Sequence, residues 1–141
     1  MTLIIGIGHP FRRDDGLGPT LAEAVGGLVH HGEGMDLMER WAGQDRVVLI
    51  DATCSGEPAG TIRVFDAAAA DLPSGLFPKG SHLIGPAEGI AMARLLGRLP
   101  AWLMVLGVEG ADFSTGQGFS PAVAAAMPAA RAELDRLIRA A

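Results

Sequence analysis

The sequence predicts one α/β domain in three layers, with a twisted, mainly parallel five-stranded sheet between helices. Short apolar runs such as residues 46–52 (RVVLIDA) and 101–108 (AWLMVLGV) have the length and composition of strands buried on both faces. Helical patterns lie between these runs, and such alternation is typical of a parallel sheet covered on both sides. With 141 residues and a hydrophobic content of 49%, the chain is expected to form a single domain, 1–141.

The expected elements alternate along the chain, each for a local reason. Strands are predicted where short apolar runs are bounded by glycine, proline or polar residues, and helices where apolar side chains recur at helical spacing. The strands are expected at residues 2–7, 28–31, 46–52, 61–65 and 101–108. The helices are expected at residues 16–25, 35–41, 86–97 and from 121 onward. The strand at 61–65 follows its predecessor too soon for a helical crossover, so we expect it to run antiparallel.

Capping residues and breakers mark the helix ends. Asp14 or Asp15 is placed to cap the first helix, with Asp14 preferred, and Ser120 followed by proline is a strong start for the last helix. Pro128 is expected to break or kink that helix, because proline cannot donate a backbone hydrogen bond. Residues 66–79 show no clean period and are expected to form a loop with at most one helical turn.

Composition excludes several classes of partner. A net charge of −5 without a basic run makes nucleic acid and anionic membranes poor partners. The first apolar run is too short for a signal peptide or a membrane span, so we expect a cytoplasmic protein without membrane insertion. The single cysteine, Cys54, favours a reducing compartment. Cys54 is expected to be a buried, inert thiol, although its position near Asp51 leaves a nucleophilic role conceivable.

Parallel sheets place their sites at the carboxyl ends of the strands, which directs attention to residues 8–18, 51–60 and 109–120. The first of these segments follows a Gly-x-Gly turn that invites a dinucleotide-binding interpretation. However, Phe11 stands where the third glycine of that fingerprint belongs, and two adjacent aspartates would repel a pyrophosphate. The loop therefore favours a cation or a polar neutral group over a phosphate.

Three polar residues stand where such a sheet would gather them: Asp15 after the first strand, Asp51 ending a buried strand, and His82 before a helix. Two carboxylates and an imidazole suit a borderline divalent metal such as nickel or zinc, and three protein ligands leave positions open. Structural roles stay open for each: Asp15 as a helix cap, Asp51 as an acceptor for loop amides, and His82 as an ordinary loop histidine. His30 and His31 are expected at a strand edge or in solvent.

Four blocks of sequence, in order, resemble the hydrogenase maturation endopeptidases. They are GIGHPFRRDDGLG, VVLIDATCSGEPAGTIRVF, GSHLIGPAEGIAMARLLGRLP and VLGVEGADFSTGQGFSPAV. The resemblance is collinear from about residue 2 to residue 138. It implies a twisted, mainly parallel sheet between helices. It also implies a peptidase that removes the C-terminal extension from the precursor of a nickel–iron hydrogenase large subunit after nickel insertion.

The same resemblance implies the site residues. The metal-contacting residues of the family fall on Asp15, Asp51 and His82, and Asp15 and Asp51 are also the catalytic candidates. The substrate would carry the nickel, and zinc or another divalent ion could occupy the site in vitro. His9 replaces the usual asparagine, as an accessory group or as a tolerated substitution. Two alternatives stay open: a non-proteolytic nickel-binding checkpoint or chaperone, and a zinc hydrolase that acts on small substrates.

Overall fold

The computed structural model describes residues 1–78, 80 and 82–140, and it contains one five-stranded sheet in the order β2-β1-β3-β5-β4. The strands are β1 (Leu3–Ile7), β2 (Leu28–His30), β3 (Arg46–Thr53), β4 (Ile62–Asp66) and β5 (Trp102–Glu109). The helices are the 3₁₀ turn η1 (Arg13–Gly16), α1 (Leu17–Ala24), α2 (Gly34–Arg40), α3 (Pro86–Leu96) and α4 (Pro121–Arg139). Among the strands of the described residues, only β4 pairs antiparallel, with β5, so the predicted fold class is confirmed.

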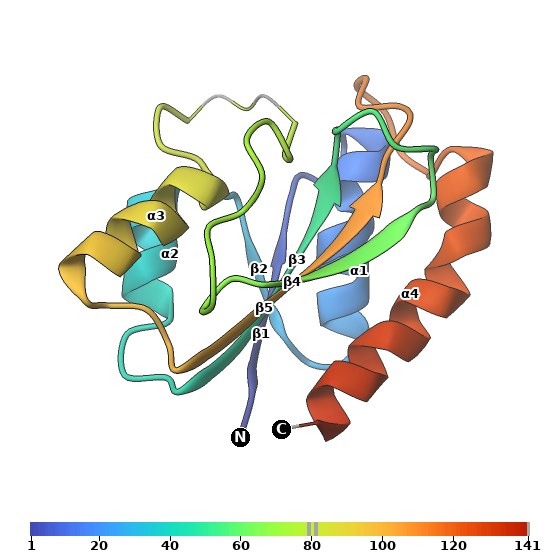
Figure 1. Ribbon diagram of the computed structural model, residues 1–141. Coiled ribbons are helices and arrows are strands. Elements are labelled where there is room, and N and C mark those ends of the chain that lie inside the picture. The colour runs from blue at the N-terminus through green and yellow to red at the C-terminus, as the bar shows by residue number, and fades with distance from the viewer. Residues whose placement is uncertain (79, 81, 141) are drawn as a thin grey trace.

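Helices cover both faces of the sheet (Figure 1), with α1 and α4 on one side and α2 and α3 on the other. The central strand β3 sends its side chains alternately into the two cores. Val48 and Ile50 pack in the core under α1 and α4, whereas Val47 and Leu49 pack in the core under α2 and α3. This double burial explains why the sequence of β3 is continuously apolar. Within the part of the chain that the structure describes, no helix is long and apolar enough to cross a membrane.

The prediction that Asp14 or Asp15 caps α1 is wrong. Helix α1 begins at Leu17, and its N-cap residue, Gly16, offers no side chain to cap it. Asp14 and Asp15 lie one turn earlier, in the buried η1 turn. Their carboxylates accept hydrogen bonds from loops instead: Asp15 from the amide of His9, and Asp14 from the segment between β5 and α4. Both carboxylates therefore bind loop amides and not the free amides at the start of α1.

The predictions for α4 are partly wrong. The helix continues through Pro128 without the expected break. The carbonyl that loses its partner belongs to Ala124, which lies with Pro128 on the exposed face of the helix, so that this carbonyl is not buried without a partner. Ser120 precedes the helix as predicted, but its hydroxyl donates to Asp14 at 2.7 Å and makes no cap bond within the helix.

Helix α1 packs on the sheet at backbone contact, through Gly18. A Cβ atom on Gly18 would lie 2.5 Å from the carbonyl oxygen of Ile7 and 2.6 Å from that of Ile50. Because neither backbone oxygen can move aside, Gly18→Ala is expected to lower the free energy of unfolding by about 3 kcal/mol in urea titrations. This loss outweighs the roughly 1 kcal/mol that alanine gains over glycine in a helix.

The matched control is Glu23→Ala, on the exposed face of the same helix. It is expected to change the free energy of unfolding by less than about 0.5 kcal/mol. If Gly18→Ala unfolds at the same urea concentration as this control, α1 does not pack at backbone contact.

Candidate active site

A pocket of about 340 Å³ opens at the carboxyl ends of β1 and β3 and extends to the start of α3. The residues that the sequence predicted for a site all line it: His9, Asp15, Asp51 and His82. Both neighbouring parallel strands end there, which is why residues far apart in sequence share one pocket.

The turn after β1 positions Asp15. Gly8 has a φ of +144°, which favours glycine, and a Cβ atom there would lie 1.8 Å from the carbonyl oxygen of Asp15. The backbone amide of His9 donates to Oδ2 of Asp15 at 2.9 Å. Asp15 is only 7% exposed. The loop thus folds back on itself and fixes one oxygen of this carboxylate at the end of β1.

Asp51 is the most unusual carboxylate in the pocket. It lies near the end of β3 and is 3% exposed, and its Oδ1 atom has no hydrogen-bond partner among the residues described. Burial raises the pKa of Asp51 well above its ordinary value, and the negative charge of Asp15 raises it further. The amide of Ala52 only partly offsets these effects. A buried carboxyl oxygen without a partner is typical of a functional site and not of a structural acceptor.

Two carboxyl groups, Asp15 and Asp51, therefore lie close enough to interact in a pocket open to solvent at one side. Such a pair has two chemical uses. It can bind a cation, which relieves the repulsion between the two charges. It can also hold one proton more tightly than an isolated carboxyl group does, which suits general acid–base catalysis.

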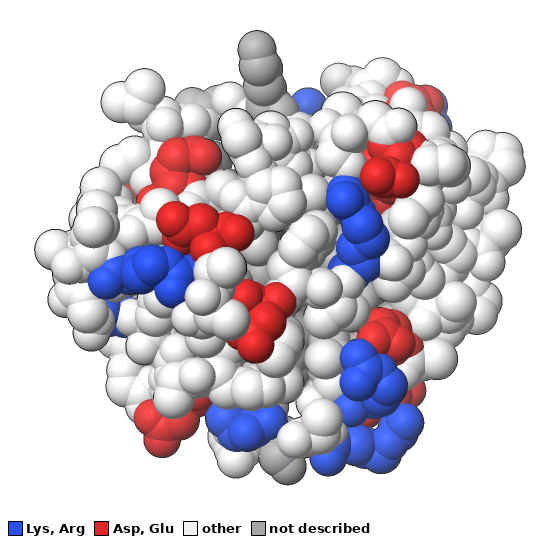
Figure 2. All heavy atoms as spheres, viewed as in Figure 1, with Lys and Arg blue, Asp and Glu red and all other residues white. Residues whose placement is uncertain are grey.

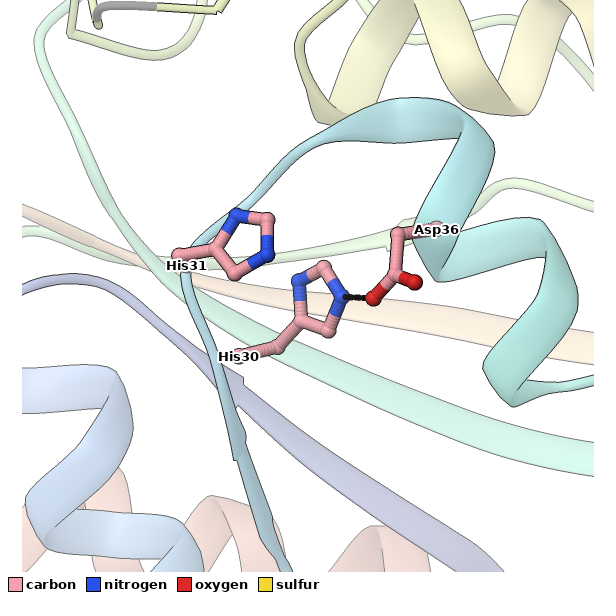
Figure 3. Close-up of side chains that lie close together, drawn as sticks. All are labelled: His30, His31 and Asp36. Atoms are coloured by element: carbon pink, nitrogen blue, oxygen red, sulfur yellow. Dashed lines mark hydrogen bonds and ion pairs between the residues drawn. The ribbon is translucent and has the colours of Figure 1, made fainter.

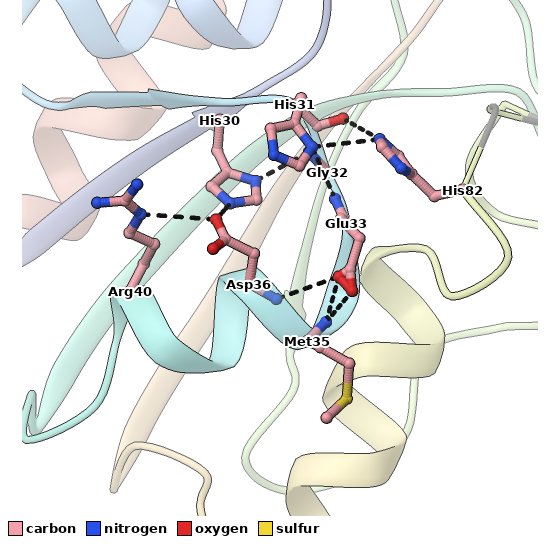
Figure 4. A network of polar contacts seen from close by, with 8 residues as sticks. All are labelled: His30, His31, Gly32, Glu33, Met35, Asp36, Arg40 and His82. Atoms are coloured by element: carbon pink, nitrogen blue, oxygen red, sulfur yellow. Dashed lines mark hydrogen bonds and ion pairs between the residues drawn. The ribbon is translucent and has the colours of Figure 1, made fainter.

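His82 reaches the pocket from the loop before α3, where it contacts His31 (Figure 4). Its Nε2 atom lies 3.2 Å from the carbonyl oxygen of His31 and 3.2 Å from Nδ1 of the same residue. The ligating atoms of Asp15, Asp51 and His82 do not gather within 4.8 Å, since another trio is the one found at that spacing in the described structure. The predicted residues thus share the pocket, but the imidazole stands apart from the two carboxylates.

That other trio is His30, His31 and Asp36, which the sequence did not predict as a group (Figure 3). His30 ends the edge strand β2, where the sequence predicted it, but its side chain is only 6% exposed. Its Nε2 lies 2.6 Å from Oδ2 of Asp36, and its Nδ1 accepts from the amide of Gly32 at 2.8 Å. Burial lowers the pKa of His30, which the hydrogen bond to Asp36 only partly opposes.

The amide of Gly32 can only donate, so Nδ1 of His30 must carry a lone pair. The ring proton therefore lies on Nε2, which donates a hydrogen bond to Asp36. His30 is therefore a neutral imidazole that joins the end of β2 to α2. No local pattern in the sequence signals this bond, because it depends on how the turn after β2 folds back onto the first turn of the helix.

Two further residues, Cys54 and Glu109, are not among the described residues that line the pocket. Cys54 is exposed, so the expectation of a buried thiol is wrong. Glu109, at the end of β5, is buried and accepts from the hydroxyls of Thr53 and Ser55 at 2.7 and 2.8 Å. It accepts the amide of Ser55 as well, which closes the loop after β3.

The comparison with family models gives one match to this sequence. The model is described as hydrogenase maturation protease (HycI), and it matches residues 28–136. The match confirms the family resemblance predicted from the four sequence blocks. Members of that family are peptidases, as the sequence predicted for this chain. Among curated proteins, no significant match is found.

Solved structures share the fold. The hydrogenase maturating endopeptidase HybD from E. coli matches with a TM-score of 0.78 at 21% identity, over 98% of this chain and 91% of that one. An endopeptidase from Escherichia coli, solved in solution, gives a TM-score of 0.82 at 22% identity over the same shares. The [NiFe] hydrogenase maturation protease HybD from Thermococcus kodakarensis gives 0.74 at 23%, over 96% and 97%. At these identities, the structural matches establish the fold alone.

Proposed function

Because the chain belongs to the hydrogenase maturation protease family, we propose that it removes the C-terminal extension from the precursor of a nickel–iron hydrogenase large subunit after nickel insertion. One observation carries the proposal beyond the family: Asp51 is a buried carboxyl group with an unpartnered oxygen, next to Asp15 in an open pocket. The single cysteine supports a reducing cytoplasm as the compartment.

In this proposal the nickel is part of the substrate. Asp15, Asp51 and His82 contact it, which requires the imidazole to move toward the two carboxylates, so that cleavage follows only when the metal has been inserted. These ligand types suit nickel or zinc, and zinc can take the same place in vitro. Acidic and basic side chains are interspersed on the face of the molecule shown in Figure 2. That mixture supports a protein substrate rather than a nucleic acid.

The two aspartates supply the chemistry of an aspartyl-type peptidase in this scheme. Hydrolysis adds the hydroxyl of water to the scissile carbonyl carbon and a proton to the departing amine nitrogen. Asp51 holds a proton more readily than an ordinary carboxyl group, which suits it to protonate the amine. Asp15, whose Oδ2 is fixed by the amide of His9, is the candidate base for the attacking water. His9 lines the same pocket as an accessory donor.

The proposal is tested with purified protein and precursor large subunit, prepared with and without nickel. Cleavage at the C-terminal extension that requires nickel supports the endopeptidase. Binding of the nickel-loaded precursor without cleavage favours the checkpoint alternative instead. Hydrolysis of small amides by zinc-loaded protein, without action on the precursor, favours the small-substrate hydrolase.

Two substitutions test the site. Asp15→Asn and His82→Ala are each expected to slow processing by at least about 100-fold, because each removes a group that contacts the substrate metal or the reacting water. Processing is measured by gel shift of the precursor, and folding by thermal unfolding. The control is Asp45→Asn, an exposed aspartate just before β3 and far from the pocket. Full processing by either site variant contradicts the site assignment.

A further inference from the structure

Two imidazoles, His31 after β2 and His82 before α3, meet at the pocket (Figure 4). Nδ1 of His31 lies 3.2 Å from Nε2 of His82, and the ring centroids are 4.9 Å apart with the planes tilted by 44°. His31 is exposed and His82 half-buried, so a ligand can reach both nitrogens. The family resemblance assigns no role to His31.

The spacing of these two nitrogens suits one metal ion. Zinc binds histidine nitrogen at roughly 2.0–2.1 Å, so two nitrogens on one ion lie about 3.0 Å apart at a right angle and about 3.4 Å apart at the tetrahedral angle. The observed 3.2 Å falls between these values. An ion could therefore replace the shared proton with little movement of either ring.

His30, although closest to His31, is not suited to be a ligand. Its Nδ1 accepts the amide of Gly32, so its proton must stay on Nε2, where Asp36 accepts it. A metal on Nε2 would force the proton onto Nδ1, facing the amide hydrogen of Gly32. His30 instead stacks on His31, with ring centroids 4.5 Å apart and planes tilted by 25°, and so holds the exposed ring in place.

We infer that His31 and His82 together bind one borderline divalent cation, through Nδ1 of His31 and Nε2 of His82. Both atoms can offer a lone pair without net loss of a proton. The carbonyl of His31 accepts from Nε2 of His82 in the metal-free protein, and on binding that proton moves to Nδ1 of His82. Nδ1 of His31 gives up a long contact, 3.4 Å, with the amide of Glu33, and the carbonyl of His31 gives up the proton of His82.

This inference rests on the proposed function, in which His82 contacts the nickel of the substrate, and it adds His31 as a second imidazole. The two imidazoles lie nearer to solvent than Asp15 and Asp51. Imidazole pairs favour nickel and zinc over magnesium or calcium, which prefer oxygen ligands. The pair therefore selects the kind of metal that is presented to the pocket.

The test is calorimetric titration of the metal-free protein with Ni²⁺ alone, without precursor. His31→Asn and His82→Asn are each expected to weaken Ni²⁺ binding at least tenfold, and Mg²⁺ is expected not to bind the pair. The control is Asp45→Asn, an exposed position that does not line the pocket, and it is expected to leave the affinity within twofold. The inference is overturned if His31→Asn binds Ni²⁺ as tightly as the unmodified protein, if Asp45→Asn weakens binding as much as His31→Asn does, or if the unmodified protein binds no Ni²⁺.

A second measurement identifies the nitrogens. In protein labelled with ¹⁵N-histidine, zinc is expected to shift Nδ1 of His31 and Nε2 of His82, while His30 keeps its metal-free signals. Processing assays separate the two proposals. If the unmodified protein does not cleave the nickel-loaded precursor, the proposed function fails whatever the titration gives. If it cleaves and His31→Asn binds Ni²⁺ normally, only the role of His31 fails.

Discussion

Replacing Asp51 by asparagine is expected to abolish processing while making the protein more stable. The substitution removes the group that we propose to carry the catalytic proton, so we expect the rate of precursor cleavage to fall by about 1,000-fold or more. It also removes a buried ionisable group, whose negative charge is disfavoured by burial and by the charge of Asp15. We expect the free energy of unfolding at neutral pH to rise by about 1–2 kcal/mol, as measured by urea titration.

The gain in stability should depend on pH. Since the pKa of Asp51 is raised in the folded protein, the folded state binds this proton more tightly than the unfolded state does. The resulting stabilisation is complete below the ordinary carboxyl pKa of about 4 and is lost as the pH rises through the raised pKa. Asp51→Asn should therefore differ little from the unmodified protein in acid and exceed its stability at higher pH.

The control for this experiment is again Asp45→Asn, which makes the same chemical change at an exposed position. It should leave both the cleavage rate and the pH dependence of stability unchanged. An Asp51→Asn variant that is less stable than the unmodified protein at neutral pH would mean that Oδ1 has a partner in solution. Undiminished cleavage would remove Asp51 from the chemistry.

Replacing Asp14 by alanine is expected to have the largest effect on stability. Asp14 has no exposed surface, and its carboxylate accepts from the amides of Ala111, Asp112 and Ser120 at 2.8, 2.9 and 2.8 Å. The hydroxyl of Ser120 donates to it as well, at 2.7 Å. Asp14→Ala leaves these donors unpaired, so we expect the free energy of unfolding to fall by about 3–5 kcal/mol in urea titrations.

The same carboxylate should contribute to acid unfolding. Burial by itself raises the pKa of Asp14, but the hydrogen bonds from Ala111, Ser120 and Asp112 outweigh it, and the pKa is lowered. A lowered pKa gives stabilisation that is complete above the ordinary carboxyl pKa and is lost as the pH falls through the folded value. Asp14→Ala should therefore lose less stability on acidification than the unmodified protein. Asp45→Ala is the control, and equal stability of the two variants at neutral pH would refute the role of Asp14.

Much of the fold follows from the sequence because the sheet is buried on both faces. The run RVVLIDA has to be a strand covered on two sides, and the short return to β4 leaves no room for a helix, which makes that strand antiparallel. The pocket follows from the same topology. Asp15 and Asp51 end neighbouring parallel strands or the loops after them, and such ends meet at one edge of the sheet.

What the sequence leaves unpredicted depends on contacts between distant segments. Asp14 resembles a helix cap locally, but its partners lie about a hundred positions further along the chain. His31 and His82 are 51 positions apart, and they meet only because β2 and the loop before α3 border the same pocket. Pro128 resembles a helix breaker, but the carbonyl that it leaves unpaired belongs to the exposed Ala124, so the helix tolerates it.

The bonds of Asp14 also bear on the order in which the loop after β1 is anchored during synthesis. Asp14 precedes Asp15 directly, and all four of its hydrogen-bond donors lie in residues 111–120. A nascent chain that has emerged from the ribosome only as far as β4 therefore has the bonds within the loop after β1, such as that from the amide of His9 to Asp15, but not the bonds to Asp14. The anchor beside Asp15 is therefore complete only when β5 and the start of α4 have been synthesised.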